Sequence, residues 1–186
     1  MTKKVMPKIS FRKVIAKNDI VLIEKLAKEI WNEHYVKIIG QQQVDYMLHK
    51  FQSRTAISEQ ITKNGYEYYL VSYQRKNIGY AAIAPTEKSD TILLSKIYLK
   101  KSFRGFGFGK QIIKFVEKLC MKRNIKKIRL TVNKNNVKSI AFYKQVGFKN
   151  IGATIKDIGN GFIMDDFIME KHCKAFVRKQ KRICRK

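Results

Sequence analysis

Residues 97–110 read IYLKKSFRGFGFGK, and this stretch decides the fold. The residues Ile97, Tyr98 and Leu99 end an apolar segment that is typical of a buried strand. Glycines then alternate with other residues, and residues 111–123 place apolar side chains at helical spacing. The pattern predicts a strand, a glycine-rich loop and a helix in succession.

The glycine-rich loop has the chemistry of an anion-binding site. Glycine permits positive φ and lets a ligand approach the backbone amides closely. The first amides of the following helix are unpaired, and the helix dipole adds about half a positive charge there. Arg104 and Lys110 add formal charge at the two ends. A pyrophosphate is therefore the expected ligand of Arg104, Gly105, Phe106, Gly107, Phe108, Gly109 and Lys110.

Other phosphate-binding patterns fit this stretch less well. A Walker loop needs Ser or Thr directly after its lysine, whereas Gln111 follows Lys110. A dinucleotide fingerprint comes early in a chain and is followed by an acidic ribose ligand, which is missing at the right distance. A merely flexible loop is the remaining alternative, but it does not explain the arginine and the phase of the glycines.

Two motifs together resemble the GNAT superfamily of acetyltransferases. Arg104-x-x-Gly107-x-Gly109 is similar to its (Q/R)xxGx(G/A) signature. Residues 133–148, NKNNVKSIAFYKQVGF, resemble its second motif, with asparagines, a tyrosine and a closing Gly-Phe. One helix and one strand fit between the two motifs. The segment Gly152–Glu170 is more weakly similar to bacterial members that include polyamine acetyltransferases.

The resemblance implies an α/β fold of the α+β kind. It would have a mixed, mostly antiparallel central sheet flanked by helices, with a splay between the strands that end near Leu99 and Asn133. One domain would cover 1–170, followed by a basic C-terminal extension over 171–186. The residue pattern predicts strands at 8–16, 66–73, 78–84, 91–100, 127–133, 148–156 and 162–170, and helices at 18–35, 41–51, 56–63, 111–123 and 137–145.

The resemblance also implies acetyl-CoA as the cofactor. The strand 97–99 would offer backbone groups to the pantetheine arm, and the glycine-rich loop would wrap the pyrophosphate. Asn136 and Tyr143 would lie near the pantetheine and the sulfur. The implied cofactor contacts are Ile97, Tyr98, Leu99, the run Arg104–Lys110, Asn133, Asn136 and Tyr143.

Acetyl transfer to an amine needs particular catalytic groups. The thioester carbonyl needs a hydrogen-bond donor, for which the superfamily suggests the backbone N–H near Leu99. The departing thiolate needs a proton, and Tyr143 can donate it because a thiol has a pKa of about 8.5 and a phenol of about 10. The alternative interpretation of Tyr143 is a core tyrosine at helical spacing.

The general base is not evident from the residues. Many superfamily members carry a glutamate on the strand before the glycine-rich loop, whereas residues 92–96 read ILLSK. Ser95 in that stretch can only order a water molecule. Other acids that could reach the site are Glu29, Glu33, Asp45, Asp165 and Asp166, and a surface position is the favoured interpretation of each.

Trp31 and Tyr35 are the candidate acceptor-binding residues. They lie on successive turns of the first helix, a region that lines the acceptor pocket in GNAT folds, although Trp31 fits the core equally well. The expected acceptor is a primary amine of a small molecule or a peptide. A polyamine would need nearby carboxylates, yet Asp165 and Asp166 point to opposite faces of a strand. The formal net charge of +26 also disfavours a polycation, so an acidic substrate or a protein N-terminus stays open.

Composition limits the remaining classes of protein. The three cysteines form no CxxC pair, and His34, His49 and His172 have no metal-ligand spacing, so we expect neither a disulfide framework nor a metal site. No apolar stretch follows the lysines of residues 1–10, and no uncharged apolar run is long enough to span a bilayer, so we expect neither a secretory signal nor a membrane-spanning segment. We therefore expect a cytoplasmic protein without membrane contact, and a homodimer is an open option.

The favoured hypothesis is an N-acetyltransferase that transfers an acetyl group from acetyl-CoA to an amine, by direct attack in a ternary complex. Two alternatives stay open. The positive charge and the basic segment 171–186 suggest a nucleic-acid-binding protein with a vestigial cofactor site. The missing strand glutamate suggests an acyl-CoA sensor without catalysis.

Overall fold

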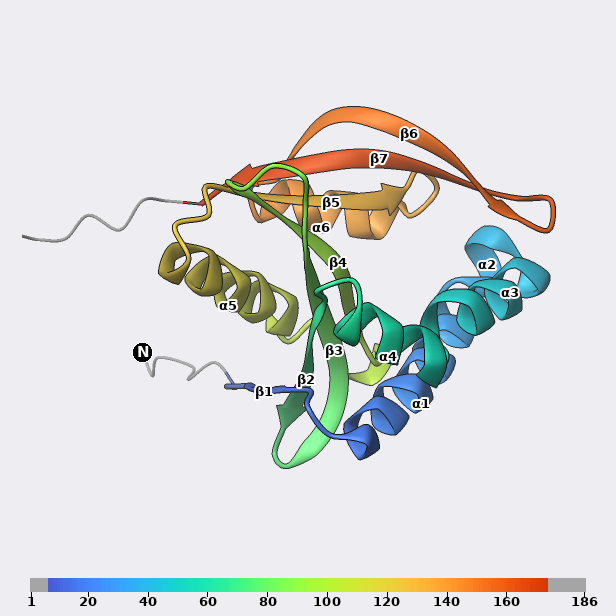
Figure 1. Cartoon of the computed structure of the whole chain (residues 1–186), viewed down its shortest axis with the longest axis horizontal. Helices are drawn as coiled ribbons and strands as arrows, with labels where there is room; N and C mark the ends of the chain where they lie inside the picture. The colour runs from blue at the N-terminus through green and yellow to red at the C-terminus, as the bar shows by residue number, and fades with distance from the viewer. Residues whose placement is uncertain (1–6, 174–186) are drawn as a thin grey trace, which may run out of the picture.

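The computed structural model describes residues 7–173 of the chain (Figure 1). Its strands are β1 (Ser10–Lys13), β2 (Glu67–Tyr73), β3 (Lys76–Pro85), β4 (Thr91–Leu99), β5 (Lys127–Asn133), β6 (Lys149–Gly159) and β7 (Phe162–His172). Its helices are α1 (Lys17–His34), α2 (Val36–Ile39), α3 (Gln41–Gln52), α4 (Arg54–Thr62), α5 (Phe108–Lys122) and α6 (Val137–Gln145), with a 3-10 helix η1 (Lys101–Phe103). The element order agrees with the expected one, except that α2 and η1 were not expected.

The strands form one sheet in the order β1-β2-β3-β4-β5-β7-β6. All neighbours are antiparallel except β4 and β5, so the expected mixed, mostly antiparallel sheet is confirmed. β4 and β5 pair only between residues 91–93 and 127–129. Beyond that point β4 stays paired with β3, and β5 stays paired with β7. The expected splay is confirmed, because each central strand follows its outer neighbour.

Helices cover both faces of the sheet (Figure 1). On one face, Ile23 and Ile30 of α1 belong to a buried cluster with Tyr68 and Tyr80 of β2 and β3. On the other face, α5 and α6 contribute to a second cluster under β4 and β5. The helix α5 is strongly amphipathic, and its buried residues are Phe108, Ile112, Ile113, Val116 and Cys120.

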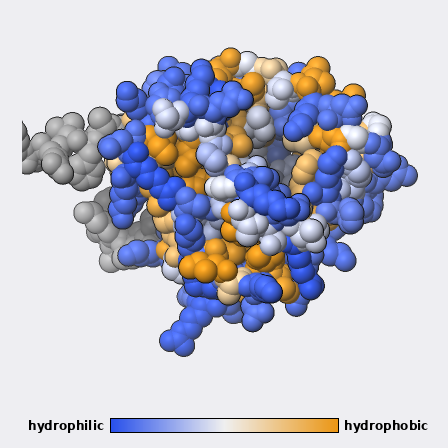
Figure 2. Space-filling view, viewed as in Figure 1, coloured by the Kyte–Doolittle hydropathy of each residue, from blue (hydrophilic) through white to orange (hydrophobic). Residues whose placement is uncertain are grey.

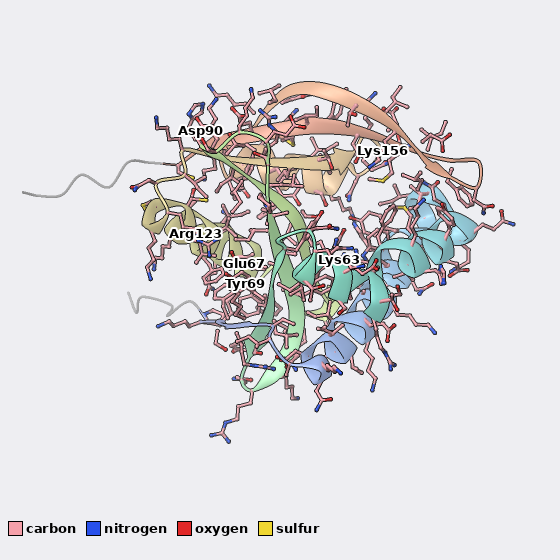
Figure 3. The ribbon with its side chains drawn as sticks, in the orientation of Figure 1. Lys63, Glu67, Tyr69, Asp90, Arg123 and Lys156 are labelled. Atoms are coloured by element: carbon pink, nitrogen blue, oxygen red, sulfur yellow. The ribbon has the colours of Figure 1, made fainter. Side chains whose placement is uncertain are left out.

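An ion-pair cluster holds the end of α5 against the edge of the sheet. Arg123 donates hydrogen bonds of 2.6 and 2.9 Å to the two carboxylate oxygens of Glu67 on β2. Figure 3 shows these two side chains next to Tyr69, whose hydroxyl donates to the same carboxylate at 2.7 Å. Arg123 is the main cause that lowers the pKa of Glu67 to about 2. The cluster fixes α5, and with it the position of the helix N-terminus.

Most boundaries differ from the sequence-based prediction by one to three residues, and three of the differences bear on the site or on the limits of the domain. α5 begins at Phe108 instead of residue 111, because Gly107 takes a left-handed conformation as N-cap and the Phe108 ring is buried in the core. β1 is shorter than expected and covers only the residues that pair with β2. β7 runs to His172, so the expected start of the basic extension falls inside a strand. Residues 174–186 of that extension lie outside the described residues, and the domain boundary stays a prediction.

The surface reflects the basic composition of the chain. Hydrophilic side chains cover much of the face in Figure 2, and hydrophobic residues show as separate patches. Within residues 7–173, no helix combines the length and the apolar character that crossing a membrane requires.

The close approach of β3 to β4 yields a stability prediction. A Cβ at Gly79 would lie 2.1 Å from the carbonyl oxygen of Tyr98. Because that contact is with backbone, Gly79→Ala should lower the free energy of unfolding by about 3 kcal/mol in urea denaturation. Gly161→Ala is the control: its Cβ would meet nothing within 4 Å, so only the positive φ should cost about 1 kcal/mol. Equal losses would contradict the tight contact.

Candidate active site

A cavity of about 940 Å³ lies along the splay between β4 and β5. Its lining runs from the glycine-rich loop and the start of α5 to α1, α3 and β7. Every residue expected at the site lines it: Trp31, Tyr35, Ile97, Tyr98, Leu99, Arg104, Gly105, Phe106, Gly107, Phe108, Gly109, Lys110, Asn133, Asn136 and Tyr143. The fold thus brings these segments together, while the contact of each residue with a ligand stays a prediction.

The backbone of β4 aims amide groups into the splay. The N–H of Lys100 donates to the carbonyl of Ile78 on β3 at 2.9 Å. In an antiparallel pair the N–H groups alternate in direction, so the N–H of Leu99 points away from β3. By the same alternation the N–H of Ile97 faces the splay, whereas the N–H of Tyr98 faces β3. Ile97 and Leu99 therefore offer their amides to the cavity. Tyr98 contributes its side chain to the lining.

The start of α5 presents unpaired amides. Gly107 caps the helix with φ at 78°, and the first helical hydrogen bond runs from Gln111 N–H to the carbonyl of Gly107 at 3.3 Å. The N–H groups of Phe108, Gly109 and Lys110 consequently have no helical acceptor. Among the described residues no side chain caps this end. Together with the helix dipole and the Lys110 charge, these amides fit a pyrophosphate.

Arg104 turns its guanidinium into the protein. Its Nε donates to the carbonyl oxygen of Leu99 at 3.0 Å, and its Nη1 lies 3.1 Å from Nδ1 of His34. Because a guanidinium only donates, Nδ1 of His34 accepts and the ring proton is on Nε2. Burial, and after it the charge of Arg104, lowers the pKa of His34, so the imidazole is neutral at pH 7. The part of Arg104 in pyrophosphate binding stays a prediction.

Helix α1 contributes Trp31, His34 and Tyr35 from one face. Trp31 lines the cavity and also belongs to the core cluster under α1, so both interpretations of this residue hold. Its ring centroid lies 4.7 Å from that of Tyr35 and 5.6 Å from that of Tyr98. His34 has no metal-ligand spacing, and the residue pattern indicated no other role for it. Its spacing of three residues from Trp31 is the signal that places it at the site.

Three tyrosines surround the region where the strands part. Tyr143 of α6 is buried, and Tyr98 of β4 and Tyr35, the C-cap of α1, are half-buried. Burial is the main cause that raises the pKa of each, to about 12 for Tyr35 and well above the ordinary value for the other two. Each hydroxyl is therefore protonated at neutral pH and can donate a hydrogen bond.

Asp166 of β7 is the carboxylate that reaches the cavity. It is 4% exposed, and burial is the main cause that raises its pKa. The expected surface position is wrong for this residue, because it lies on the inner face of β7. Asp165 points the other way, and its Oδ1 lies 2.5 Å from Nζ of Lys134. The remaining candidate acids, Glu29, Glu33 and Asp45, do not line the cavity and contact Lys100, the amide of Lys101 and Gln41.

Gly109 has a packing role besides its unpaired amide. A Cβ at this position would lie 2.9 Å from the tip of the Phe142 ring. The absence of a side chain therefore lets the start of α5 approach α6 closely. The glycine spacing of the loop reflects helix packing as well as anion binding.

The two parallel central strands part over the N-terminus of α5, and a cavity fills the gap between them. This arrangement is the one expected of the acyltransferase fold that the sequence resembles. The profile described as the Acetyltransferase (GNAT) family matches residues 24–148, which is more than half of the chain. The chain belongs to the GNAT acetyltransferase family. Family membership confirms the expected class of enzyme, an acyltransferase that uses acetyl-CoA.

Individual relatives cover the chain to different extents. The spermidine N(1)-acetyltransferase of Thermoplasma acidophilum is 25% identical over 167 residues, which is 88% of this chain and 96% of that protein. The thialysine N-epsilon-acetyltransferase of Bos taurus is 31% identical over 87 residues, so the match spans 47% of this chain and only 45% of that protein.

A solved structure supports the fold. The PaiA N-acetyltransferase from Thermoplasma acidophilum, in complex with coenzyme A, superposes with a TM-score of 0.71. The match covers 89% of this chain and 99% of that chain, at 23% identity. At this identity the likeness shows the shared fold.

Charge at the start of α5 gives a prediction about cofactor binding. Gly107→Asp and Gly107→Asn place side chains of equal size at the left-handed N-cap, a conformation that both residues tolerate. The carboxylate should repel the pyrophosphate, so coenzyme A should bind the Asp variant at least about tenfold more weakly than the Asn variant in calorimetry. Equal dissociation constants would place the diphosphate elsewhere.

The contact between Arg104 and His34 gives a prediction about titration. Arg104→Met removes a positive charge beside the imidazole, so the pKa of His34 should rise toward its ordinary value of 6.5. NMR titration of the ring C–H signal, assigned with His34→Asn, measures this pKa. Lys63→Met, which removes an exposed cation directly after α4 and outside the cavity lining, should leave the pKa of His34 unchanged. A pKa that stays the same or falls in Arg104→Met would disprove the contact.

Proposed function

We propose that this protein transfers the acetyl group of acetyl-CoA to a primary amine of a small molecule or peptide, by direct attack within a ternary complex. The observation that carries the proposal is the continuity of the cavity. It joins the unpaired amides of α5 to the aromatic end beside α1, past the amide of Leu99. Donor and acceptor can therefore be held at the same time.

The lining of the cavity also favours direct attack over a covalent relay. Cysteine is the nucleophile that a thioester exchange would use most readily. Of the two described cysteines, Cys120 is buried in the core and Cys173 follows β7, and neither lines the cavity. The amine itself is therefore the attacking group in the proposed reaction.

Acetyl-CoA, when bound, supplies the thioester whose acetyl group is transferred. The protein supplies groups around the position of its carbonyl. The N–H of Leu99 points into the splay without a partner on β3, so it can donate to the carbonyl oxygen as negative charge develops there. Such a donor costs no rearrangement during the reaction, because the sheet already fixes its direction.

Tyr143 is the proposed proton donor to the departing sulfur. Its hydroxyl is buried, lines the cavity and has a raised pKa, so it is protonated before the reaction. A thiol has an ordinary pKa of about 8.5, and burial in the same apolar region raises it as it raises that of the phenol, so the departing thiolate becomes a stronger base there than in water. The apolar packing of Tyr143 against Phe148 holds the ring in place.

The acceptor must lose a proton before it can attack. An alkylamine has a pKa of about 10.4, so its neutral form costs about 4.6 kcal/mol at pH 7. Desolvation between the buried rings of the cavity lowers this cost, because burial disfavours the charged form of an amine. β4 carries no acid at this point, and Ser95 lines the cavity instead.

Two measurements, one of cofactor binding and one of turnover, distinguish this function from its alternatives. Calorimetry with acetyl-CoA should show binding, and a thiol-release assay over a panel of primary amines should show turnover. Binding without release with any amine would favour the acyl-CoA sensor, to which the missing strand acid points. A lack of acetyl-CoA binding together with salt-sensitive RNA binding would favour the nucleic-acid-binding protein.

Removal of the Tyr143 hydroxyl tests the proposed proton transfer. Tyr143→Phe keeps the ring and its packing, so the dissociation constant of acetyl-CoA should change little. Loss of the proton donor should lower kcat by about 100-fold. Thiol release at saturating substrates measures kcat, and calorimetry measures the binding. An unaffected kcat would remove Tyr143 from the proton-transfer step.

A further inference from the structure

We propose that Asp166 binds the ammonium group of the acceptor and takes up its proton before the attack, and that the cavity walls beside it select amines with a single positive charge and an apolar body. The inference rests on the proposed N-acetyltransferase function and adds the chemical class of its acceptor. Family membership alone leaves this class open.

Asp166 is buried without a cation. It is 4% exposed, lines the cavity and forms no ion pair within residues 7–173. An ionised carboxylate is costly to bury alone, so a cation brought by a ligand would stabilise it. The side chain of Thr131, which also lines the cavity, favours its charged form. Its neighbour Asp165 is different, because Lys134 already neutralises it at 2.5 Å.

The walls beside Asp166 are aromatic or apolar. Met164 of β7 packs in one cluster with Trp31, Tyr35, Ile39 and Met47, and all five line the cavity. Met164 lies two residues before Asp166, on the same face of β7. Flat rings and flexible thioethers pack well against apolar groups of varied shape. This end of the cavity therefore offers one charge and a large apolar contact area.

The distribution of charge disfavours a polycation. Asp166 is the one acid among the residues that line the cavity, and Arg104, Lys110 and Lys138 line the rest of it. A triamine such as spermidine would bring further ammonium groups that have no carboxylate there. The formal net charge of +26 adds a repulsive field at longer range.

The position of Asp166 relative to the helices is fixed. Near the β6–β7 turn, Tyr46 of α3 donates to the carbonyl of Ile158 at 2.5 Å, and Gln43 donates to that of Ile163 at 3.0 Å. Figure 1 shows the tip of this hairpin beside α2 and α3. The carboxylate on β7, the aromatic residues of the α1 region and Met47 on α3 are therefore held as one site.

The chain contains its own probe for acceptor binding. Trp31 is its single tryptophan and lies in the cavity wall, so its fluorescence reports binding without any chemical step. The full chain is titrated with 2-phenylethylamine, n-hexylamine and spermidine in the presence of coenzyme A. Thiol release from acetyl-CoA with the same three amines gives KM and kcat in parallel.

Asp166→Asn should weaken binding of both monoamines by at least about 30-fold, because it removes a buried charge partner. Asp166→Glu, which restores the charge, should recover part of the affinity. Asp165→Asn is the matched control, since its side chain pairs with Lys134 on the other face, and it should change the affinity by less than about twofold. Circular dichroism shows whether each variant is folded.

The results distinguish this inference from the proposed function. Monoamine binding that depends on Asp166, without thiol release, would support the inference and overturn the proposed acetyl transfer. Thiol release with a KM that is equal in wild type, Asp166→Asn and Asp166→Glu would overturn the inference alone. Tighter binding of spermidine than of either monoamine, or no change in Trp31 fluorescence with any of the three amines, would also overturn it.

Discussion

Strands β4 and β5 pair only through the first three residues of each strand. Beyond them, β4 stays paired with β3 and β5 with β7. The gap leaves backbone groups that a continuous sheet would use, including the N–H groups of Ile97 and Leu99. Unpaired backbone groups need another partner when they are buried. Arg104 already binds the Leu99 carbonyl, and the amides face the cavity where the cofactor is expected. The site therefore exists because the sheet is interrupted.

Charge is separated along the cavity. Lys110 and the unpaired amides of α5 lie where a diphosphate would be stabilised, and the Arg104 guanidinium lies against His34 of α1. Asp166 lies on β7, and neutral tyrosines line the region between. An anionic donor and a cationic acceptor would thus each meet opposite charge, while the transfer itself takes place among uncharged donors. In such a buried region, hydrogen-bond donors act more strongly than they would in water.

Several residues serve the core and the site at once. Trp31 packs under α1 and forms the cavity wall, and Gly109 allows α5 to approach α6 while its amide stays unpaired. Tyr143 is held by core packing and lines the cavity. A side chain that is fixed by packing loses little further freedom when a ligand binds. The apparent conflict between a core interpretation and a site interpretation thus disappears.

The family, the order of the main strands and helices, and the glycine-rich loop at Arg104–Lys110 could all be predicted from the residues alone, because they depend on local patterns of glycine, charge and apolar spacing. The sequence also placed Asp165 and Asp166 on opposite faces of a strand. Only the tertiary structure decided which of the two is buried, and that Arg104 turns inward to His34. Burial and contacts between distant segments depend on how β7 and α1 are placed around the cavity. Residue spacing along the chain does not specify that placement.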